Sequence, residues 1–355
     1  MNSIYMFSQL ILTIFACAYF FMKISQKRSL NNEKNESYKD EAERNNRLSK
    51  IHLTKPLTEK SRPKSFDEIV GQKDGVRALL SALSGNNPQH IIIYGPAGVG
   101  KTAAARLALE YAKKSKGTPF LPDAPFVEVD STIVRFDERS IADSLIGSVH
   151  DPIYQGAGNL GVLGIPEPKE GAVTKAHGGV LFLDEIGELH PMQMNKLLKV
   201  LEDGKVILES SYYNKSNKNI PLYVHEIFKN GLPADFRLIG ATTRRPCEIP
   251  DALRSRCVEV YFNALSITDI RNIIKNAVKN TNMEFDDGVL EYMSLYAKNG
   301  RDAVKMVESA VGAARLDNLY RVSLKEAKWV IKSGRYKRRQ DAYKDDSIIN
   351  ISLIK

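Results

Sequence analysis

The stretch "HIIIYGPAGVGKT", residues 90–102, decides the fold of this chain. A short apolar run from Ile91 to Tyr94 leads into a glycine-rich turn. The turn is followed by "AAARLALEYAKK", residues 103–114, in which apolar residues recur at helical spacing. Strand, glycine-rich loop and helix in this order are the context that a phosphate-binding loop requires. The stretch therefore predicts a nucleotide site within an α/β fold.

The residues of this loop have separate expected tasks. Its glycines permit backbone angles and a close approach that side chains would block, so backbone N–H groups can point at phosphate oxygens. Lys101 would reach the β- and γ-phosphates of ATP, and the hydroxyl of Thr102 would bind Mg²⁺. The expected ATP-binding loop comprises Gly95, Pro96, Ala97, Gly98, Val99, Gly100, Lys101 and Thr102.

A second stretch, "HGGVLFLDEIGELH" at residues 177–190, ends an apolar run in two carboxylates, Asp184 and Glu185. By itself such a pair could be a metal site, an acid and a base, or the solvated end of a buried strand. The continuous apolar run is typical of a central strand covered on both faces, and ligands of such sheets bind at the carboxyl ends of the strands. We therefore expect Asp184, together with Thr102, to hold Mg²⁺ and Glu185 to orient and deprotonate water.

Polar residues in three further regions complete the predicted site. "FRLIGATT", residues 236–243, is typical of another buried strand, and its terminal hydroxyls could position the attacking water. Arg254 and Arg256 precede a strand and would face away from their own nucleotide, within reach of a neighbour's γ-phosphate. Arg301 stands at the start of a predicted helix. Taken singly, each arginine is more often part of a surface salt bridge, but this context favours the functional interpretation.

Composition limits the class of protein. A chain of 355 residues exceeds one small domain, and its 43% hydrophobic and 26% charged residues are typical of globular proteins. The net charge of +9 would suit nucleic acid or an anionic membrane. Because no long block of like charges is present, we attribute this net charge to solvated lysine side chains on the surface. Cys17, Cys247 and Cys257 have no CxxC spacing, which disfavours a disulfide framework and a zinc site.

The N-terminus predicts a membrane anchor. "IYMFSQLILTIFACAYFFM", residues 4–22, carries no charge and is long enough to cross a hydrocarbon core of about 30 Å as a helix. A cleaved signal peptide is the alternative, but it needs positive charge ahead of the apolar run, whereas Lys23, Lys27 and Arg28 follow it. The positive-inside rule then leaves the rest of the chain in the bacterial cytoplasm, attached to the cell membrane by a single span. Residues 23–60 are polar and predict a tether.

Smaller patterns predict the connecting elements. Pro191 opens a helix with an apolar stripe, and residues 205–235 are expected to form a hairpin with a short helix. No strand is expected after Phe262, where the chain becomes helical. Two capping boxes are expected in that helical part, formed by Ser266 with Asp269 and by Ser323 with Glu326.

The sequence resembles the AAA+ ATPases over residues 61–335, and within them most closely the ATPase module of the LonB-type ATP-dependent proteases. The resemblance rests on five stretches in the order of the family: "FDEIVGQ", "GPAGVGKT", "KAHGGVLFLDEIGELHPMQMNKLLKVLEDGKV", "GLPADFRLIGATTRRPCEIPDALRSRC" and "NGRDAV". It implies an α/β AAA+ P-loop NTPase fold with a central parallel sheet and a small C-terminal helical lid, preceded by one N-terminal transmembrane helix. The implied boundaries are a large nucleotide-binding domain at 61–262, the lid at 263–335 and a tail at 336–355.

The resemblance also implies roles for single residues. Thr243 would be sensor 1, Arg256 an arginine finger acting in trans, and Arg301 sensor 2. The residues expected near the adenine are Val70, Gly71 and Gln72. AAA+ remodelers grip a polypeptide with loops that face a central pore, and the glycine-rich segment Tyr154–Lys169 is the candidate here, with an ordinary surface loop as the alternative.

The implied function is a membrane-anchored, ring-forming AAA+ ATPase, expected as a hexamer, that couples ATP hydrolysis to protein unfolding or remodelling. The alternative is an AAA+ motor acting in transcription activation or on DNA. Nucleic acid is disfavoured as a partner because no helix-turn-helix follows the lid and the GAFTGA loop of the activators has no match. LonB-type proteases continue into a serine–lysine peptidase domain that this sequence lacks, so ATP hydrolase activity is expected and peptidase activity is not. The chain is then either truncated or frame-disrupted, or a stand-alone motor that could act with a separate protease component.

Overall fold

The computed structural model describes residues 44–50, 54, 56–134, 143–150, 166–210, 213–217 and 220–340. A compact unit begins at Leu57. The predicted membrane-spanning segment, residues 4–22, lies outside the described residues. Among the described residues, no helix is both long and apolar enough to cross a bilayer.

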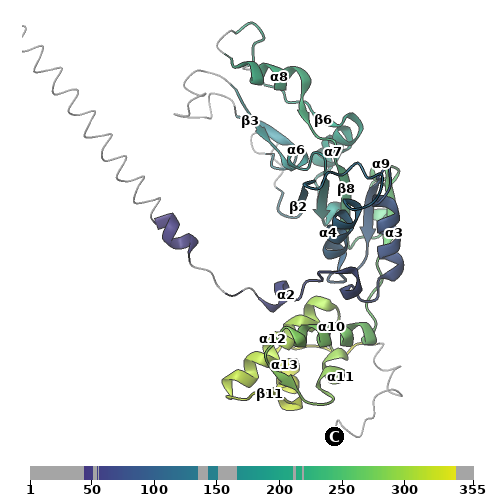
Figure 1. Ribbon diagram of the computed structural model, residues 1–355, viewed down its shortest axis with the longest axis vertical. Coiled ribbons are helices and arrows are strands. Elements are labelled where there is room, and N and C mark those ends of the chain that lie inside the picture. Colours follow the sequence, from purple (N-terminus) through teal and green to yellow (C-terminus); the bar gives the residue numbers. More distant parts are fainter. Residues whose placement is uncertain are drawn as a thin grey trace, which may run out of the picture. The chain divides into compact units, whose positions relative to one another are not determined.

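The centre of this unit is a parallel sheet (Figure 1). The sheet has five strands in the order β2-β5-β8-β1-β9. Its strands are β1 (His90–Tyr94), β2 (Phe126–Asp130), β5 (Val180–Asp184), β8 (Arg237–Thr242) and β9 (Cys257–Tyr261). Strands β1, β5 and β8 each have a neighbour on both sides, and their side chains are almost entirely buried. Continuous apolar runs are needed there because helices cover both faces. The predicted α/β fold with a central parallel sheet is confirmed.

Alternate residues of each strand pack on opposite faces of the sheet. In β1, Ile91 and Ile93 belong to the core that includes α3 and α4, whereas Ile92 and Tyr94 belong to the core that includes α6 and α7. These helices are α3 (Lys73–Leu83), α4 (Lys101–Ala112), α6 (Ala172–Lys175) and α7 (Pro191–Asp203). The three isoleucines have no exposed surface, and burying one such side chain stabilises a fold by about 1.5–3 kcal/mol.

Helix α7 begins as its sequence predicts, with Pro191 as its first residue, and it ends at Gly204 in a left-handed conformation. After it, β6 (Lys205–Val206) pairs antiparallel with β7 (Leu232–Pro233). Between them in the sequence lies α8 (Leu222–Asn230), which closes a small core of its own. The predicted hairpin with a short helix is therefore present.

Short elements connect the larger ones. They are α2 (Leu57–Lys60), α9 (Asp251–Arg254), three 3₁₀ turns at Phe66–Glu68, Ile186–Glu188 and Pro246–Glu248, and the antiparallel pair β3 (Gly147–His150) and β4 (Glu167–Glu170). Of the candidate substrate loop Tyr154–Lys169, residues 154–165 lie outside the described residues. Its last residues belong to the start of β4, so the interpretation as a substrate loop stays a prediction.

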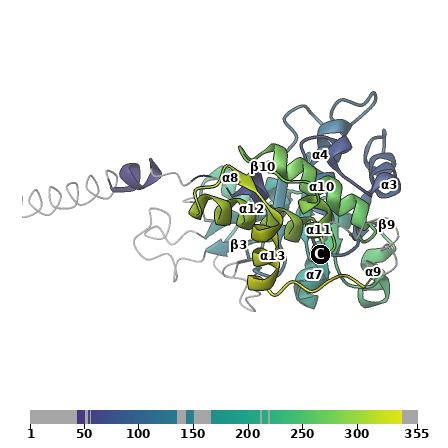
Figure 2. The same cartoon turned by 90° about the horizontal axis from the view of Figure 1, so that it is seen from below.

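After Phe262 the chain is mainly helical, as expected. Its helices are α10 (Ile267–Lys279), α11 (Val289–Ser294), α12 (Gly300–Leu316) and α13 (Leu324–Ser333), which lie together as one group (Figure 2). Both predicted capping boxes are present, at the starts of α10 and α13. The expectation of no further strands is wrong in one detail, since β10 (Glu284–Phe285) pairs in parallel with β11 (Arg321–Val322). Two residues are too few for alternation to show in a sequence.

The end of the predicted tether and the start of the predicted tail both belong to the folded part. Leu57, inside the predicted tether at 23–60, is buried, and its N–H donates to the Glu308 carboxylate at 3.1 Å. Arg339, inside the predicted tail at 336–355, donates its backbone N–H to the Leu295 carbonyl at 2.9 Å. The division between a large domain and a lid at residue 262 stays a prediction.

Candidate nucleotide-binding site

The phosphate loop connects the end of β1 to the start of α4, and two of its glycines, Gly95 and Gly98, leave no room for a side chain. Gly98 has φ 73°, and a Cβ built on it would lie 2.9 Å from Oδ1 of Asn299. A Cβ on Gly95 would lie 2.5 Å from the carbonyl oxygen of Phe262. The loop therefore packs directly against the residue that follows β9 and the residue that precedes α12. Any larger side chain would force these elements apart.

The start of α12 is hydrogen-bonded to the phosphate loop. The N–H of Gly300 donates to the Gly98 carbonyl at 3.0 Å, and Asn299 caps the helix by accepting from the N–H of Asp302 at 2.9 Å. Arg301 is the second residue of this helix. The contact places Arg301 beside the loop although about 200 residues separate them in the sequence.

Lys101 is buried at the first position of α4. Its ammonium donates to the carbonyl oxygens of Gly95 at 2.6 Å and Pro96 at 3.0 Å. Burial lowers the pKa of Lys101, the carboxylates of Glu185 and Asp184 oppose that shift, and the Arg301 guanidinium adds to it. A charge held in this environment would be stabilised strongly by an anion such as a phosphate group.

The predicted acid pair lies at the carboxyl end of β5. Asp184 is the last residue of the strand, and its Oδ1 accepts the N–H of Glu185 at 3.2 Å. Burial raises the pKa of Asp184, with a further rise from the Glu185 charge, while Lys101 lowers it. Glu185 has φ 50°, a left-handed backbone conformation that residues other than glycine rarely adopt. Strained backbone conformations of this kind occur most often at functional sites.

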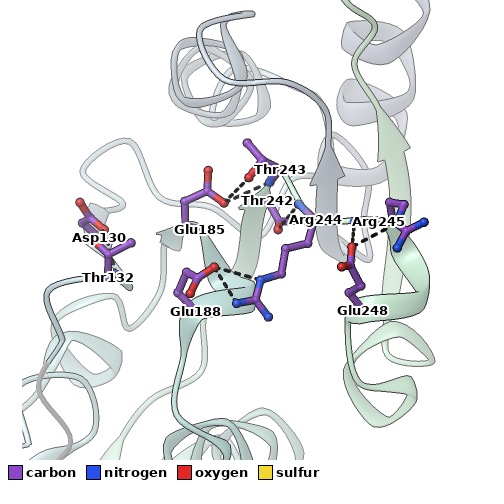
Figure 3. A network of polar contacts seen from close by, with 9 residues as sticks. All are labelled: Asp130, Thr132, Glu185, Glu188, Thr242, Thr243, Arg244, Arg245 and Glu248. Carbon is purple, nitrogen blue, oxygen red and sulfur yellow. Dashed lines mark hydrogen bonds and ion pairs between the residues drawn. The ribbon is translucent and has the colours of Figure 1, made fainter.

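Thr243 holds the carboxylate of Glu185. The backbone N–H and the hydroxyl of Thr243 each donate to Oε2 of Glu185 at 3.1 Å (Figure 3). Strands β5 and β8 are neighbours in the sheet, so their carboxyl ends bring the two residues together. The sequence predicted a site at each strand end but not this contact between them.

A second pair, which the sequence alone did not predict, lies beside this contact. Arg244 pairs with Glu188, with 2.7 Å between Nη2 and Oε1 (Figure 3). Its backbone N–H also donates to the hydroxyl of Thr242 at 3.0 Å. The ion pair ties the segment after β8 to the segment after β5, and the hydrogen bond to Thr242 fixes Arg244 to the end of β8. An arginine next to Thr243 was the available signal, but its partner could not be chosen among the many acidic residues.

One cavity of about 920 Å³ brings most of the predicted site residues together. The predicted residues that line it are Val70, Ala97, Gly98, Val99, Gly100, Lys101, Thr102, Asp184, Glu185 and Arg301. Charged residues that the sequence alone did not single out also line it, among them Arg62, Arg106 and Lys305. Residues 58–65, which lead from α2 toward the first 3₁₀ turn, also line the cavity.

The residues expected near the adenine divide between two cavities. Val70 lines both the large cavity and a neighbouring one of about 640 Å³, whereas Gly71 and Gln72 line the smaller cavity alone. Gln72 is only 2% exposed. Its side-chain amide is bonded to both backbone polar groups of Asn263, at 2.8 and 2.9 Å.

Arg256 lies at the amino ends of the parallel strands, opposite the end of the sheet at which the phosphate loop begins. Strands β1 and β9 are parallel, with Cys257 level with His90 at their amino ends. The phosphate loop follows the carboxyl end of β1, so Arg256 is separated from it by the length of the strand. Its guanidinium donates to the Ala252 carbonyl at 2.7 Å and pairs with Glu202 of α7.

Arg254, the neighbouring candidate, is engaged differently. It pairs with Glu259 of β9 at 2.7 Å and with Asp251 at 3.3 Å. Neither arginine lines the cavity that contains Lys101. The structure therefore places both outside this cavity. The other predicted site residues that do not line it are Gly71, Gln72, Gly95, Pro96 and Thr243.

The residues present fit a magnesium–nucleotide complex. Thr102 and Asp184 both line the cavity and offer a hydroxyl and a carboxylate oxygen. Mg²⁺ typically takes one or two carboxylates and completes its shell with waters and substrate phosphates. Among the described residues, no group of three or more His, Cys, Asp or Glu side chains could hold a metal ion. One hydroxyl and one carboxylate leave the other ligand positions to waters and phosphate oxygens, which suits a metal that binds together with its nucleotide.

The sheet order, the phosphate loop and the strand-end acid pair define an AAA+ P-loop ATPase fold. A family model described as magnesium chelatase, subunit ChlI, matches residues 65–266, which is more than half of the chain. The chain belongs to that family.

Relatives of known sequence extend the comparison. The chain is 54% identical over 332 residues to Lon protease 2 of Bacillus subtilis (strain 168), a match that covers 94% of this chain and 60% of that protein. It is 29% identical over 271 residues to the DNA polymerase III subunit gamma of Buchnera aphidicola subsp. Schizaphis graminum, covering 72% of this chain and 61% of that protein. The chain thus spans about three fifths of the length of these relatives.

Solved structures show the same fold. The RuvB K64R mutant of Thermotoga maritima matches with a TM-score of 0.53 at 18% identity, covering 77% of this chain and 73% of that one. At this identity the likeness shows the fold alone.

Proposed function

We propose that this chain is the ATP-hydrolysing motor of a LonB-type ATP-dependent protease and couples hydrolysis to the unfolding or remodelling of proteins. The observation that carries the proposal is the position of Glu185. Its carboxylate is held by Thr243 at the end of β5 and lines the same cavity as Lys101 and Arg301. A carboxylate base beside a phosphate loop is the arrangement that nucleotide hydrolysis needs.

In the proposed reaction, the oxygen of a water molecule attacks the γ-phosphorus of ATP. The bond from that phosphorus to the β–γ bridging oxygen breaks, ADP leaves with the bridging oxygen, and phosphate is released. Glu185 takes a proton from the attacking water, while Lys101 and the loop N–H groups offset the phosphate charge. Bound Mg²⁺, held by Thr102 and Asp184, would offset further charge on the phosphates.

The position of Arg256 supports a homo-oligomeric ring. An arginine finger must reach the γ-phosphate, and Arg256 is placed at the amino edge of the sheet, away from its own phosphate loop. A neighbouring copy in a head-to-tail ring could present its Arg256 to this site. We propose the hexamer that the family resemblance implies.

The 54% identity to Lon protease 2 supports a protein substrate. We propose that the motor acts with a peptidase component, which is either a further part of the same protein or a separate chain. We also propose that residues 4–22 anchor the chain in the cell membrane and leave the ATPase part in the cytoplasm.

The test of this function uses ATP hydrolysis with magnesium. The chain should hydrolyse ATP, and an unfolded protein such as casein should stimulate turnover while duplex DNA should not. Lys101→Ala should weaken ATP binding by about 10- to 100-fold, because a hydrogen bond to a charged group contributes about 1.5–3 kcal/mol. Binding is measured by titration with a fluorescent ATP analogue. The control is Lys114→Ala, an exposed lysine in the turn that follows the same helix. Stimulation by DNA and not by casein would favour the alternative of a DNA motor.

The anchor is tested by fractionation. The full chain should sediment with membranes and resist extraction by high salt, because an uncharged and mostly apolar run of about 19 residues buries enough surface to hold a helix in the bilayer. A chain that begins at Leu57 should be recovered in the soluble fraction. Recovery of the full chain in the soluble fraction would show that residues 4–22 are not a retained anchor.

A further inference from the structure

The chain passes from β9 into α10 through residues 262–266. The phosphate loop lies on one side of this passage, and Arg301 belongs to the helices on the other side. Any change in the angle between the sheet and these helices must therefore turn the backbone of this passage. The contacts of its residues show where it can turn.

The first residue of the passage is fixed to the sheet. The N–H of Phe262 donates to the Tyr94 carbonyl at 2.8 Å, which continues the pairing of β9 with β1. A Cβ on Gly75 would lie 2.7 Å from the Phe262 ring, and one on Gly95 would lie 2.5 Å from its carbonyl oxygen. Phe262 is therefore packed between α3 and the phosphate loop without room to move.

Asn263 is held to the same side by Gln72. The Nε2 amide of Gln72 donates to the Asn263 carbonyl at 2.8 Å, and Oε1 accepts the Asn263 N–H at 2.9 Å. The side-chain amide thus takes the place of a neighbouring strand. Glutamine suits this task because it carries one acceptor and a donor group at a fixed spacing. Val70, which lines the larger cavity, lies two residues before Gln72. The hydrogen bonds of Gln72 therefore also connect the passage to the wall of that cavity.

Leu265 is held to the helices instead. Arg339 donates from Nη2 to the Leu265 carbonyl at 2.7 Å and from Nη1 to the Ala297 carbonyl at 3.4 Å. Its backbone N–H donates to the Leu295 carbonyl at 2.9 Å. The planar guanidinium can bind two carbonyl groups at once. Leu265 is 2% exposed, and the core to which it belongs includes residues of α3 and α4 as well as of α10 and α12, so the contacts of Arg339 are what assign it to the helices.

Ala264 is exposed between these two held residues. We propose that Gln72 and Arg339 are positioning residues that confine the hinge between sheet and helices to Ala264, and thereby set the place of Arg301 over the phosphates. The inference rests on the proposed ATP hydrolysis. On this proposal the side chain of Gln72 holds the hinge and does not contact the adenine.

Kinetics provide the first test. Gln72→Leu keeps the size of the side chain but loses both hydrogen bonds, and kcat should fall by about 10- to 100-fold because small displacements at a reacting site have effects of that order. The KM for ATP should change by less than about threefold, since the loop contacts to the phosphates remain. Gln72→Glu, which lacks the donor toward the Asn263 carbonyl, should lower kcat in the same direction.

A double-mutant cycle distinguishes positioning from general destabilisation. If Gln72 acts by placing Arg301, then Gln72→Leu should cause no further loss of kcat in a chain that already carries Arg301→Ala. The control is Ser323→Ala, which removes the capping contacts of α13 in the same helical group. It should lower Tm while leaving kcat unchanged. Additive losses for Gln72 and Arg301 would overturn the proposal.

The matched pair on the other side is Arg339→Gln and Lys337→Gln. Each removes one positive charge from the segment after α13, but only Arg339 binds the hinge. Arg339→Gln should lower kcat by about as much as Gln72→Leu, and Lys337→Gln should not change it. Equal effects of the two substitutions would show that charge, and not the hinge contact, is responsible.

Hydrogen exchange tests the hinge without hydrolysis. In Gln72→Leu the N–H of Asn263 should exchange at least about 10-fold faster, because its bonding partner is gone. The amides of Ile270 and Ile274 in α10 should keep their protection. Unchanged exchange at Asn263 in the full chain would overturn the proposal. A wild-type chain that fails to hydrolyse ATP would instead overturn the proposed function, and the exchange result would still decide whether Gln72 holds the hinge.

Discussion

Glu185→Gln should bind ATP and hydrolyse it about 10²- to 10⁴-fold more slowly than the wild-type chain, the contribution of general base catalysis. Glutamine has the size and shape of glutamate, and its amide oxygen can still accept the two hydrogen bonds from Thr243. The substitution therefore removes the base and leaves the geometry. The rate of hydrolysis is measured as phosphate released, and ATP binding is measured by titration with a fluorescent ATP analogue.

A neighbouring carboxylate serves as the control. Glu188 lies three residues further on, and its side chain is paired with Arg244. Glu188→Gln should keep turnover within about threefold, because a partly exposed ion pair contributes only about 0–1 kcal/mol. Chelation of magnesium should stop hydrolysis in the wild-type chain. Full turnover by Glu185→Gln would remove Glu185 from the role of base.

Arg256→Ala should also bind ATP normally but lose about 10³-fold or more in turnover, which is the range of an arginine finger that acts only on charge in the transition state. In the isolated chain the guanidinium is paired with Glu202, with side-chain exposures of 36% and 53%. A pair this exposed contributes at most about 1 kcal/mol. The guanidinium can therefore leave Glu202 for a neighbour's phosphate at little cost.

Mixing two inactive variants tests whether the finger acts in trans. A Lys101→Ala subunit keeps its Arg256, and an Arg256→Ala subunit keeps its phosphate loop. An interface that combines an intact finger with an intact loop should regain part of the activity. Arg254→Ala is the control, because Arg254 is held by two carboxylates of its own chain, Glu259 and Asp251, whereas Arg256 is paired, among the described residues, with Glu202 alone. If mixed rings assemble and stay inactive, Arg256 is structural and Arg254 becomes the candidate finger.

The sequence by itself determined the features that depend on neighbours along the chain. A glycine loop between a strand and a helix places Lys101 and Thr102 whatever surrounds them, because backbone angles and helix termini are local properties. The same holds for the capping boxes and for the acid pair at the end of a buried strand. These patterns were sufficient to predict the α/β class and one wall of the candidate site.

The tertiary structure alone decided which of these pieces meet. The contact of Thr243 with Glu185 joins residues 58 positions apart, and the grip of Gln72 on Asn263 joins residues 191 positions apart. Arg339 reaches back 74 positions to Leu265 from a segment whose sequence predicts a tail. A single chain contains many possible donors and acceptors, and a hydrogen bond between distant residues leaves no periodic pattern. Only the sheet order and the packing of the helices select the pairs that form, which is why the hinge contacts could not be predicted and the phosphate loop could.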